Sequence, residues 1–152
     1  SFVSVNIIKK SSQDEASAVH SIADLAGKTV SVGTGSVSEH WITSWNAASS
    51  PSVASGQIQM KQIDSLEQAA SALSSGQVDA VIADNMQIQY YLTKVKPKAP
   101  FQVAIRNVHR QSQGLIFAPS LPEATALQIN QAIARLKENG TVDGIRKRWI
   151  PE

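Results

Sequence analysis

The stretch TVSVGTGSVSEHW, residues 29–41, decides the fold class of this chain. Its first four residues are β-branched or small and predict a strand, Gly33 and Gly35 predict a tight turn, and Ser36 opens a helical pattern. The first turn of a helix has unpaired backbone N–H groups and the positive end of the helix dipole, and glycines let a ligand approach the backbone closely. This unit is therefore a candidate binding site for an anionic group.

Short strands and helices alternate on both sides of this unit up to about residue 100. Strands rich in β-branched and apolar residues are predicted at 2–8, 29–32, 57–63 and 78–83. Helical segments are predicted at 21–26, 36–48, 64–76 and 86–95, with polar loops through residue 18 and over 47–56. Asp64 is expected to be the N-cap of its helix, and Gly27 and Gly76 to end theirs. The alternation predicts a doubly wound α/β unit.

The pattern changes after residue 100. Strands are predicted at 101–105 and 114–117, and a helix that begins at Pro122 and runs to Glu138 follows them. A second helix comes directly after it. The apolar faces of these two helices comprise Ile129, Ile133 and Leu136 in the first, and Val142, Ile145 and Trp149 in the second. With no strand between them, the two helices are expected to cover something other than the preceding sheet.

Composition excludes several classes of function. The chain has 152 residues, enough for one domain with a real core, and a net charge of only +2. Its cations are scattered apart from a cluster at 146–148, interpreted as the last turn of a helix, so no nucleic-acid interface is predicted. Cysteine is absent, which excludes disulfides and thiolate chemistry. Because the chain begins at Ser1 without methionine, we expect a processed product with its signal peptide removed, or a fragment.

The glycine turn admits several interpretations. A Walker phosphate loop is excluded because no Gly-Lys-Ser/Thr follows, and a dinucleotide fingerprint is weak because Ser38 holds its third glycine position. The turn is either purely structural, closed by a capping box between Ser36 and Glu39, or a small-anion site. In the second interpretation the Ser36 hydroxyl and the amides of Val37 and Ser38 hold a carboxylate.

Asp84 follows the buried strand 78–83, at the edge where open α/β sheets place their ligand contacts. It is either the N-cap of the next helix or a binding residue. A carboxylate beside an anion-binding turn suits a ligand that carries both charges, such as an α-amino acid.

No constellation of catalytic residues is present. The three histidines, at 20, 40 and 109, are dispersed, and the sequence lacks both a zinc-protease motif and a nucleophile elbow. Trp41 and Trp45 stand one helical turn apart and are expected to pack rather than to bind. We therefore expect no enzymatic activity, no cofactor and no metal.

Four segments of the chain match one family. They are SIADLAGKTVSVGTGS (21–36), ALSSGQVDAVIADN (72–85), QGLIFAPS (113–120) and AIARLKENGTVDGIRKRWI (132–150). Together they resemble family 3 of the bacterial extracellular solute-binding proteins, the polar amino-acid-binding proteins of ABC importers, which have the type II periplasmic-binding fold. The match covers almost the whole chain and is best to the second half of such a protein.

The resemblance implies a domain organisation. Two α/β lobes close on the ligand in this family, so residues 1–107 would form the second, flavodoxin-like lobe. Residues 108–152 would be a helical tail that returns to the first lobe, with a hinge strand within 107–114. The body of the first lobe would be absent, and the tail would then be expected to self-associate through its exposed apolar faces.

The resemblance also implies roles for individual residues. Gly35, Ser36 and Val37 match the turn that binds the ligand carboxylate, and Asp84 matches the aspartate that binds its ammonium group. Val37 lacks the usual hydroxyl, which Ser38 would supply. Gly33 stands where relatives often have a longer polar residue that contacts the ligand side chain.

The implied function is binding of an amino acid for delivery to an ABC permease in the membrane, outside the cytoplasm. Half of the site should bind weakly, because affinity depends on enclosing the ligand from both sides. The alternatives are an amino-acid sensor module of a receptor or kinase and, permitted by the fold class alone, a nucleotide-dependent enzyme.

Overall fold

The computed structural model describes residues 2–11, 19–49, 56–112 and 114–149. The chain divides into two compact units, residues 2–111 and 112–152. The loops predicted through residue 18 and over 47–56 lie largely outside the described residues. None of the helices within the described ranges is both long enough and apolar enough to cross a bilayer.

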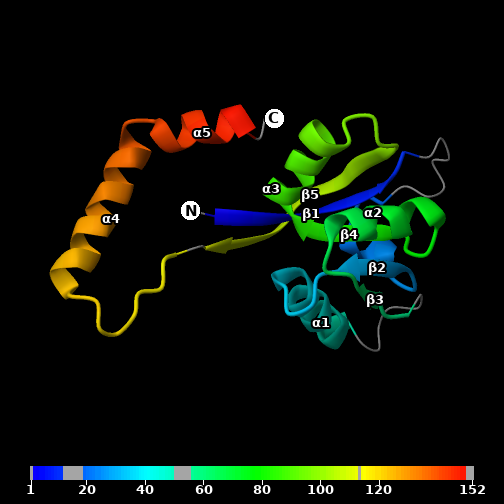
Figure 1. The fold of residues 1–152 in the computed structure, drawn as a ribbon. Coiled ribbons are helices and arrows are strands. Elements are labelled where there is room, and N and C mark those ends of the chain that lie inside the picture. Colours follow the sequence, from blue (N-terminus) through cyan, green and yellow to red (C-terminus); the bar gives the residue numbers. More distant parts are fainter. Residues whose placement is uncertain (1, 12–18, 50–55, 113, 150–152) are drawn as a thin grey trace. The chain divides into compact units, whose positions relative to one another are not determined.

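The first unit contains a five-stranded sheet with the order β3-β2-β4-β1-β5 (Figure 1). The strands are β1 (Phe2–Lys10), β2 (Thr29–Val32), β3 (Gln59–Gln62), β4 (Ala80–Asp84) and β5 (Phe101–Ser112). β2 pairs in parallel with both β3 and β4, whereas β1 pairs antiparallel with β4. The sheet is therefore mixed, and the carboxyl ends of its three parallel strands meet at one edge.

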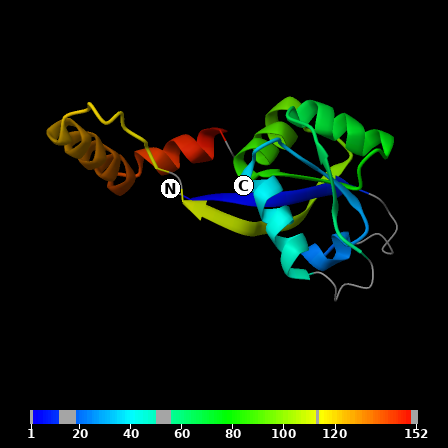
Figure 2. The same ribbon diagram turned by 90° about the horizontal axis from the view of Figure 1, so that it is seen from below.

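Helical segments cover both faces of this sheet (Figure 2). They are the 3-10 turn η2 (Ile22–Leu25), α1 (Val37–Ser49), α2 (Leu66–Ser75) and α3 (Asn85–Tyr90), which continues into the π-helical turn η3 (Tyr91–Val95). Ile42 of α1 belongs to one buried cluster, and Leu73 of α2 and Ile88 of α3 belong to the other. The predicted doubly wound α/β architecture is confirmed.

Two tryptophans of α1 pack as expected. Trp41 and Trp45 are partly buried against the first cluster. Trp41 also stacks on His109 of β5, with ring centroids 6.1 Å apart. Both tryptophans therefore contribute to the packing of α1 on the sheet.

Helix α2 begins one residue later than the sequence pattern predicts. Its N-cap is Ser65, whose hydroxyl accepts a hydrogen bond from the Gln68 amide at 3.5 Å. The prediction that Asp64 caps this helix is wrong, because the Asp64 carboxylate binds the backbone of Thr34 instead. Gly76 ends α2 as predicted, at a left-handed φ of 78° that favours glycine.

Strand β5 is much longer than the predicted strand at 101–105. Its second half is polar, and Asn107 within it has a φ of 55°, a left-handed conformation that asparagine tolerates better than most residues. A strand with polar residues at exposed positions lacks the apolar alternation from which strands are predicted. The predicted strand therefore ends at residue 105, before the observed end of β5.

A buried asparagine ties three segments of the first unit together. Asn6 of β1 is 1% exposed. Its side-chain amide donates to Asn85 Oδ1 at 2.8 Å, and its Oδ1 accepts from the Asn107 amide at 2.9 Å. A buried amide needs such partners to offset its desolvation. Asn6 therefore links β1 to the start of α3 and to β5.

The second unit contains the helices α4 (Glu123–Glu138) and α5 (Thr141–Trp149), close to the predicted bounds. Pro122 occupies the N-cap position of α4. The strand predicted at 114–117 is wrong: this segment is irregular, with Ile116 fully exposed, because no strand among the described residues pairs with it. Neither helix buries a residue. The boundary between lobe and tail at residues 107 and 108 remains a prediction.

Candidate ligand-binding site

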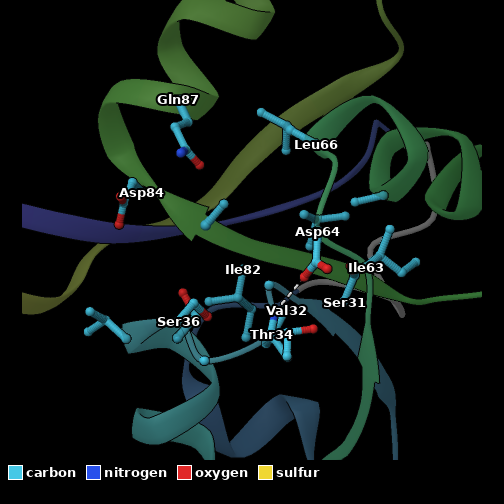
Figure 3. A pocket seen from close by; sticks show the side chains of 17 residues that line it. Ser31, Val32, Thr34, Ser36, Ile63, Asp64, Leu66, Ile82, Asp84 and Gln87 are labelled. Atoms are coloured by element: carbon cyan, nitrogen blue, oxygen red, sulfur yellow. Dashed lines mark hydrogen bonds between the residues drawn. The ribbon is translucent and has the colours of Figure 1, made fainter.

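A pocket of about 470 Å³ opens at the carboxyl ends of the parallel strands (Figure 3). Its lining includes the end of β2, the glycine turn, the start of α1 and the end of β4. All five residues expected to bind a ligand line this one pocket: Gly35, Ser36, Val37, Ser38 and Asp84. Their role in binding remains a prediction.

The glycine turn projects the start of α1 into the pocket. The Ser36 amide donates to the carbonyl oxygen of Gly33 at 3.2 Å, which closes the turn. Gly35 has a φ of 65°, where a side chain would strain the backbone. Gly33 has no such requirement, and a Cβ added there would lie 3.6 Å from the Ser36 Cβ, an ordinary contact. Its lack of a side chain therefore leaves room in the pocket.

The first residues of α1 present open hydrogen-bond donors. The Ser36 hydroxyl oxygen accepts a bond from the Glu39 amide at 3.2 Å, as an N-cap does. The amides of Val37 and Ser38 have no hydrogen-bond acceptor among the described residues. Because the Ser36 oxygen is already an acceptor, its hydrogen is left to donate toward a ligand.

Glu39 does not complete the capping box of the purely structural interpretation of the turn. The box would require its carboxylate to accept from the Ser36 amide, which instead binds Gly33. The Glu39 carboxylate instead accepts a hydrogen bond from the amide of the preceding residue, Gly35, at 2.5 Å. It also accepts one from the side-chain amide of Gln62. The Gly35 amide, one of the donors matched to a ligand carboxylate, is therefore already in use.

Asp64 is a pocket residue that sequence reasoning assigned to a helix cap. Its Oδ1 accepts from the Thr34 amide at 2.7 Å, and Figure 3 shows this bond beside the pocket. The hydrogen bond from the Thr34 backbone, followed by that from the Thr34 side chain, lowers the pKa of Asp64. A signal was available in the sequence, since Asp64 lies just beyond β3 and neighbouring parallel strands end at the same edge.

Asp84 lies at the end of β4, on the wall of the pocket. It occupies the N-cap position of α3 but makes no capping hydrogen bond with its side chain. Its carboxylate is half-buried, and this desolvation raises its pKa. Gln87, one turn along α3, also lines the pocket near Asp84 (Figure 3).

Comparison with known proteins identifies the family. The profile of the bacterial extracellular solute-binding proteins, family 3, matches residues 53–152, about two thirds of the chain. The chain therefore belongs to this family. Its members are binding proteins rather than enzymes, in agreement with the prediction from the sequence.

Two curated relatives show similarity over most of the chain. The amino-acid-binding protein AabA of Dichelobacter nodosus is 27% identical over 133 residues, which are 88% of this chain and 49% of AabA. The L-cystine-binding protein TcyJ of Bacillus subtilis is 27% identical over 134 residues, which are 87% of this chain and 46% of TcyJ. The chain thus spans about half the length of these relatives.

Solved structures support the fold. The GluR0 ligand-binding core from Nostoc punctiforme, in complex with L-glutamate, superposes with a TM-score of 0.74 at 24% identity, covering 99% of this chain and 62% of that one. The mixed five-stranded sheet with helices on both faces is that of the type II periplasmic-binding fold.

Proposed function

We propose that residues 1–107 form one lobe of an amino-acid-binding site and hold both charged groups of the ligand backbone. The observation that carries this proposal is the composition of the pocket. Asp84, whose carboxylate has no hydrogen-bond partner among the described residues, lies on one wall, and open helix N–H donors lie on another. The α-ammonium and α-carboxylate groups of an amino acid are complementary to these two walls.

The carboxylate would bind at the start of α1. The amides of Val37 and Ser38 and the Ser36 hydroxyl supply three donors, and the helix dipole adds to their attraction for an anion. Gly35 contributes its left-handed backbone rather than its amide, because Glu39 already accepts from that amide. Ser38 is 3% exposed, so only a small part of this residue reaches the surface of the pocket.

The ammonium group would bind at Asp84. Partial burial makes the ionised carboxylate unfavourable in the empty pocket, which is why the pKa of Asp84 is raised. A cation placed against it offsets that cost. Charge-assisted hydrogen bonds of this kind contribute roughly 1.5–3 kcal/mol.

In this proposal the whole protein is the binding component of an ABC importer and works outside the cytoplasm with a membrane permease. The names of AabA and TcyJ, which describe binding of an amino acid and of L-cystine, support amino-acid binding. Residues 108–152 would be the hinge strand and the helical tail of the opposite lobe, which is consistent with relatives about twice as long. Uptake of labelled amino acids by cells with and without the gene tests the role in transport, and equal uptake would contradict it.

The binding site itself is tested on the 152-residue chain. We expect millimolar amino acids to shift the ¹⁵N-HSQC resonances of Val37, Ser38 and Asp84, with weak affinity because the chain supplies only one of the two lobes. Asp84→Asn should weaken binding roughly tenfold to hundredfold, from the loss of one charge-assisted hydrogen bond. Asp143→Asn, on α5, is the matched control and should leave the titration unchanged.

Two results would contradict this proposal. If amino acids cause the same resonance shifts in Asp84→Asn as in the unmodified chain, Asp84 does not bind the ammonium group. Tight binding of the isolated chain in calorimetry would show that a second lobe is not needed, contrary to the two-lobed arrangement.

A further inference from the structure

The charges around the pocket are all of one sign. Its lining contains two carboxylates, Asp64 and Asp84, and no lysine, arginine or histidine among the described residues. A third carboxylate, that of Glu39, is held against the same turn through the Gly35 amide. In the proposed complex the α-ammonium group of the ligand pairs with Asp84, and the ligand carboxylate binds the N–H donors of α1. The negative charge of Asp64 then has no ligand group to balance it.

The Asp64 carboxylate is ionised and keeps capacity for another partner. The hydrogen bond from the Thr34 backbone lowers its pKa, so the group is charged at neutral pH. An ionised carboxylate offers about four lone-pair sites on its two oxygens, more than the Thr34 residue occupies. The residue is exposed to solvent at the pocket rather than enclosed in the core.

The two pocket aspartates come from different segments, Asp64 from the residues after β3 and Asp84 from the end of β4. In Figure 3 the side chains of Asp84 and Asp64 lie apart across the pocket, and Ser36 and Thr34 lie below them. A ligand with its α-carbon near Ser36 and its ammonium group on Asp84 could extend its side chain toward Asp64. Small residues keep this volume open, because Gly33, Ala69 and Ala83 line the pocket.

We propose that the pocket prefers an amino acid whose side chain carries a positive charge, and that Asp64 is the residue that recognises this charge. The inference rests on the proposed amino-acid-binding function and adds the class of ligand. An acidic side chain at the same place would meet a like charge, and a neutral one would gain at most a hydrogen bond without the charge pairing. Because Asp64 is exposed, the preference should be modest and should weaken as salt is added.

The test compares isosteric ligands that differ in charge. The 152-residue chain is titrated with L-arginine and with L-citrulline, its neutral isostere, and followed by ¹⁵N-HSQC at low and at high salt. We expect arginine to bind about two- to fivefold more tightly at low salt, the range for a solvent-exposed ion pair, with the difference reduced at high salt.

Asp64→Asn assigns the preference to one residue. The variant removes the charge but keeps an oxygen that can accept from the Thr34 amide, so the turn should be retained. We expect it to bind arginine and citrulline equally. Asp79→Asn is the matched control, because Asp79 also accepts from a backbone amide, that of Thr29 at 2.8 Å, but does not line the pocket. It should keep the full preference for arginine.

The outcomes separate this inference from the proposed function. Equal binding of arginine and citrulline by the unmodified chain overturns the charge preference but leaves amino-acid binding intact, whether or not the variant folds. A preference that survives in Asp64→Asn overturns the role of Asp64. Failure of every amino acid to shift the pocket resonances overturns both proposals.

Discussion

Two helices with similar sequence patterns, α1 and α5, differ in whether their apolar faces are buried. Ile42 of α1 is fully buried in the first unit, whereas Ile145 and Trp149 of α5 are 57% and 53% exposed. Both helices carry apolar residues on one face, but among the described residues only α1 has a sheet within its own unit to cover that face. An amphipathic pattern therefore predicts that a helix needs a partner, and it does not predict that the partner is present.

The largest expected effect is a direct test of this difference. Ile42→Ala should lower the free energy of unfolding by about 2–5 kcal/mol, because it leaves a cavity in a buried cluster. Ile145→Ala removes the same atoms from an exposed site and should change stability by less than about 0.5 kcal/mol. Urea unfolding followed by circular dichroism measures both. Similar losses would mean that the α5 face is covered in solution.

A smaller effect is expected at the strained residue of β5. Asn107→Ala should cost about 1 kcal/mol, because an alanine side chain is less tolerant of the left-handed φ of 55°. Asn107→Gly should not incur this strain, and the backbone bond to Asn6 is available in both variants. Gln102→Ala, at an exposed position earlier in β5, is the control. Equal stability of the alanine and glycine variants would remove the argument from strain.

A weaker effect, dependent on protein concentration, is expected from the second unit. The exposed apolar side chains of α4 and α5 should drive self-association of the 152-residue chain. Sedimentation velocity should show the average mass rising with concentration, and Leu136→Lys combined with Ile145→Lys should reduce the rise. Gln128→Lys, on an exposed polar position of α4, should not reduce it. A constant monomer mass would contradict this prediction.

The smallest effects are expected from pH, and they have opposite signs at the two pocket aspartates. The raised pKa of Asp84 means that its ionised form costs stability at neutral pH, and this cost disappears as the pH falls through that pKa. The lowered pKa of Asp64 means that it contributes stability above the unfolded value of 3.8, which is lost as the pH falls through the folded pKa.

The two asparagine variants separate these effects. Asp84→Asn should raise the free energy of unfolding at pH 7, and Asp64→Asn should lower it. Both differences should vanish in strong acid, where each carboxylate is protonated in the folded and unfolded states. Urea unfolding at pH 7 and in strong acid measures them, and equal signs at pH 7 would contradict the assignment.

Helices could be predicted from apolar periodicity whether or not their apolar face is covered, as α4 and α5 show, whereas a strand could be predicted only where it also has a strand to pair with. β2 has the bounds that its β-branched residues predict, and Gly76 ends α2 where the sequence places a stop. The errors occur where local pattern and pairing disagree. Residues 114–117 have an apolar pattern but no strand to pair with, and the polar half of β5 is a strand because its backbone pairs despite its side chains.

In the candidate site, too, sequence pattern predicts where residues lie but not which groups they contact. The sequence brings Ser36 and Asp84 to one edge of the sheet because both follow parallel strands. It does not predict which backbone amide a nearby carboxylate binds. Glu39 binds Gly35 instead of Ser36, and Asp64 binds Thr34 instead of its own helix, because the turn geometry sets which donors are open.

The place of β1 in the sheet has a consequence for the order in which this protein is made. β1 ends at Lys10 and lies between β4, which begins at Ala80, and β5, which begins at Phe101. During synthesis the first strand therefore leaves the ribosome long before either neighbour exists, and a long loop must close before it can pair. The Asn6 side chain, which joins Asn85 and Asn107, is satisfied only when all three segments are in place. We therefore expect the unit to complete its core only after β5 has been synthesised.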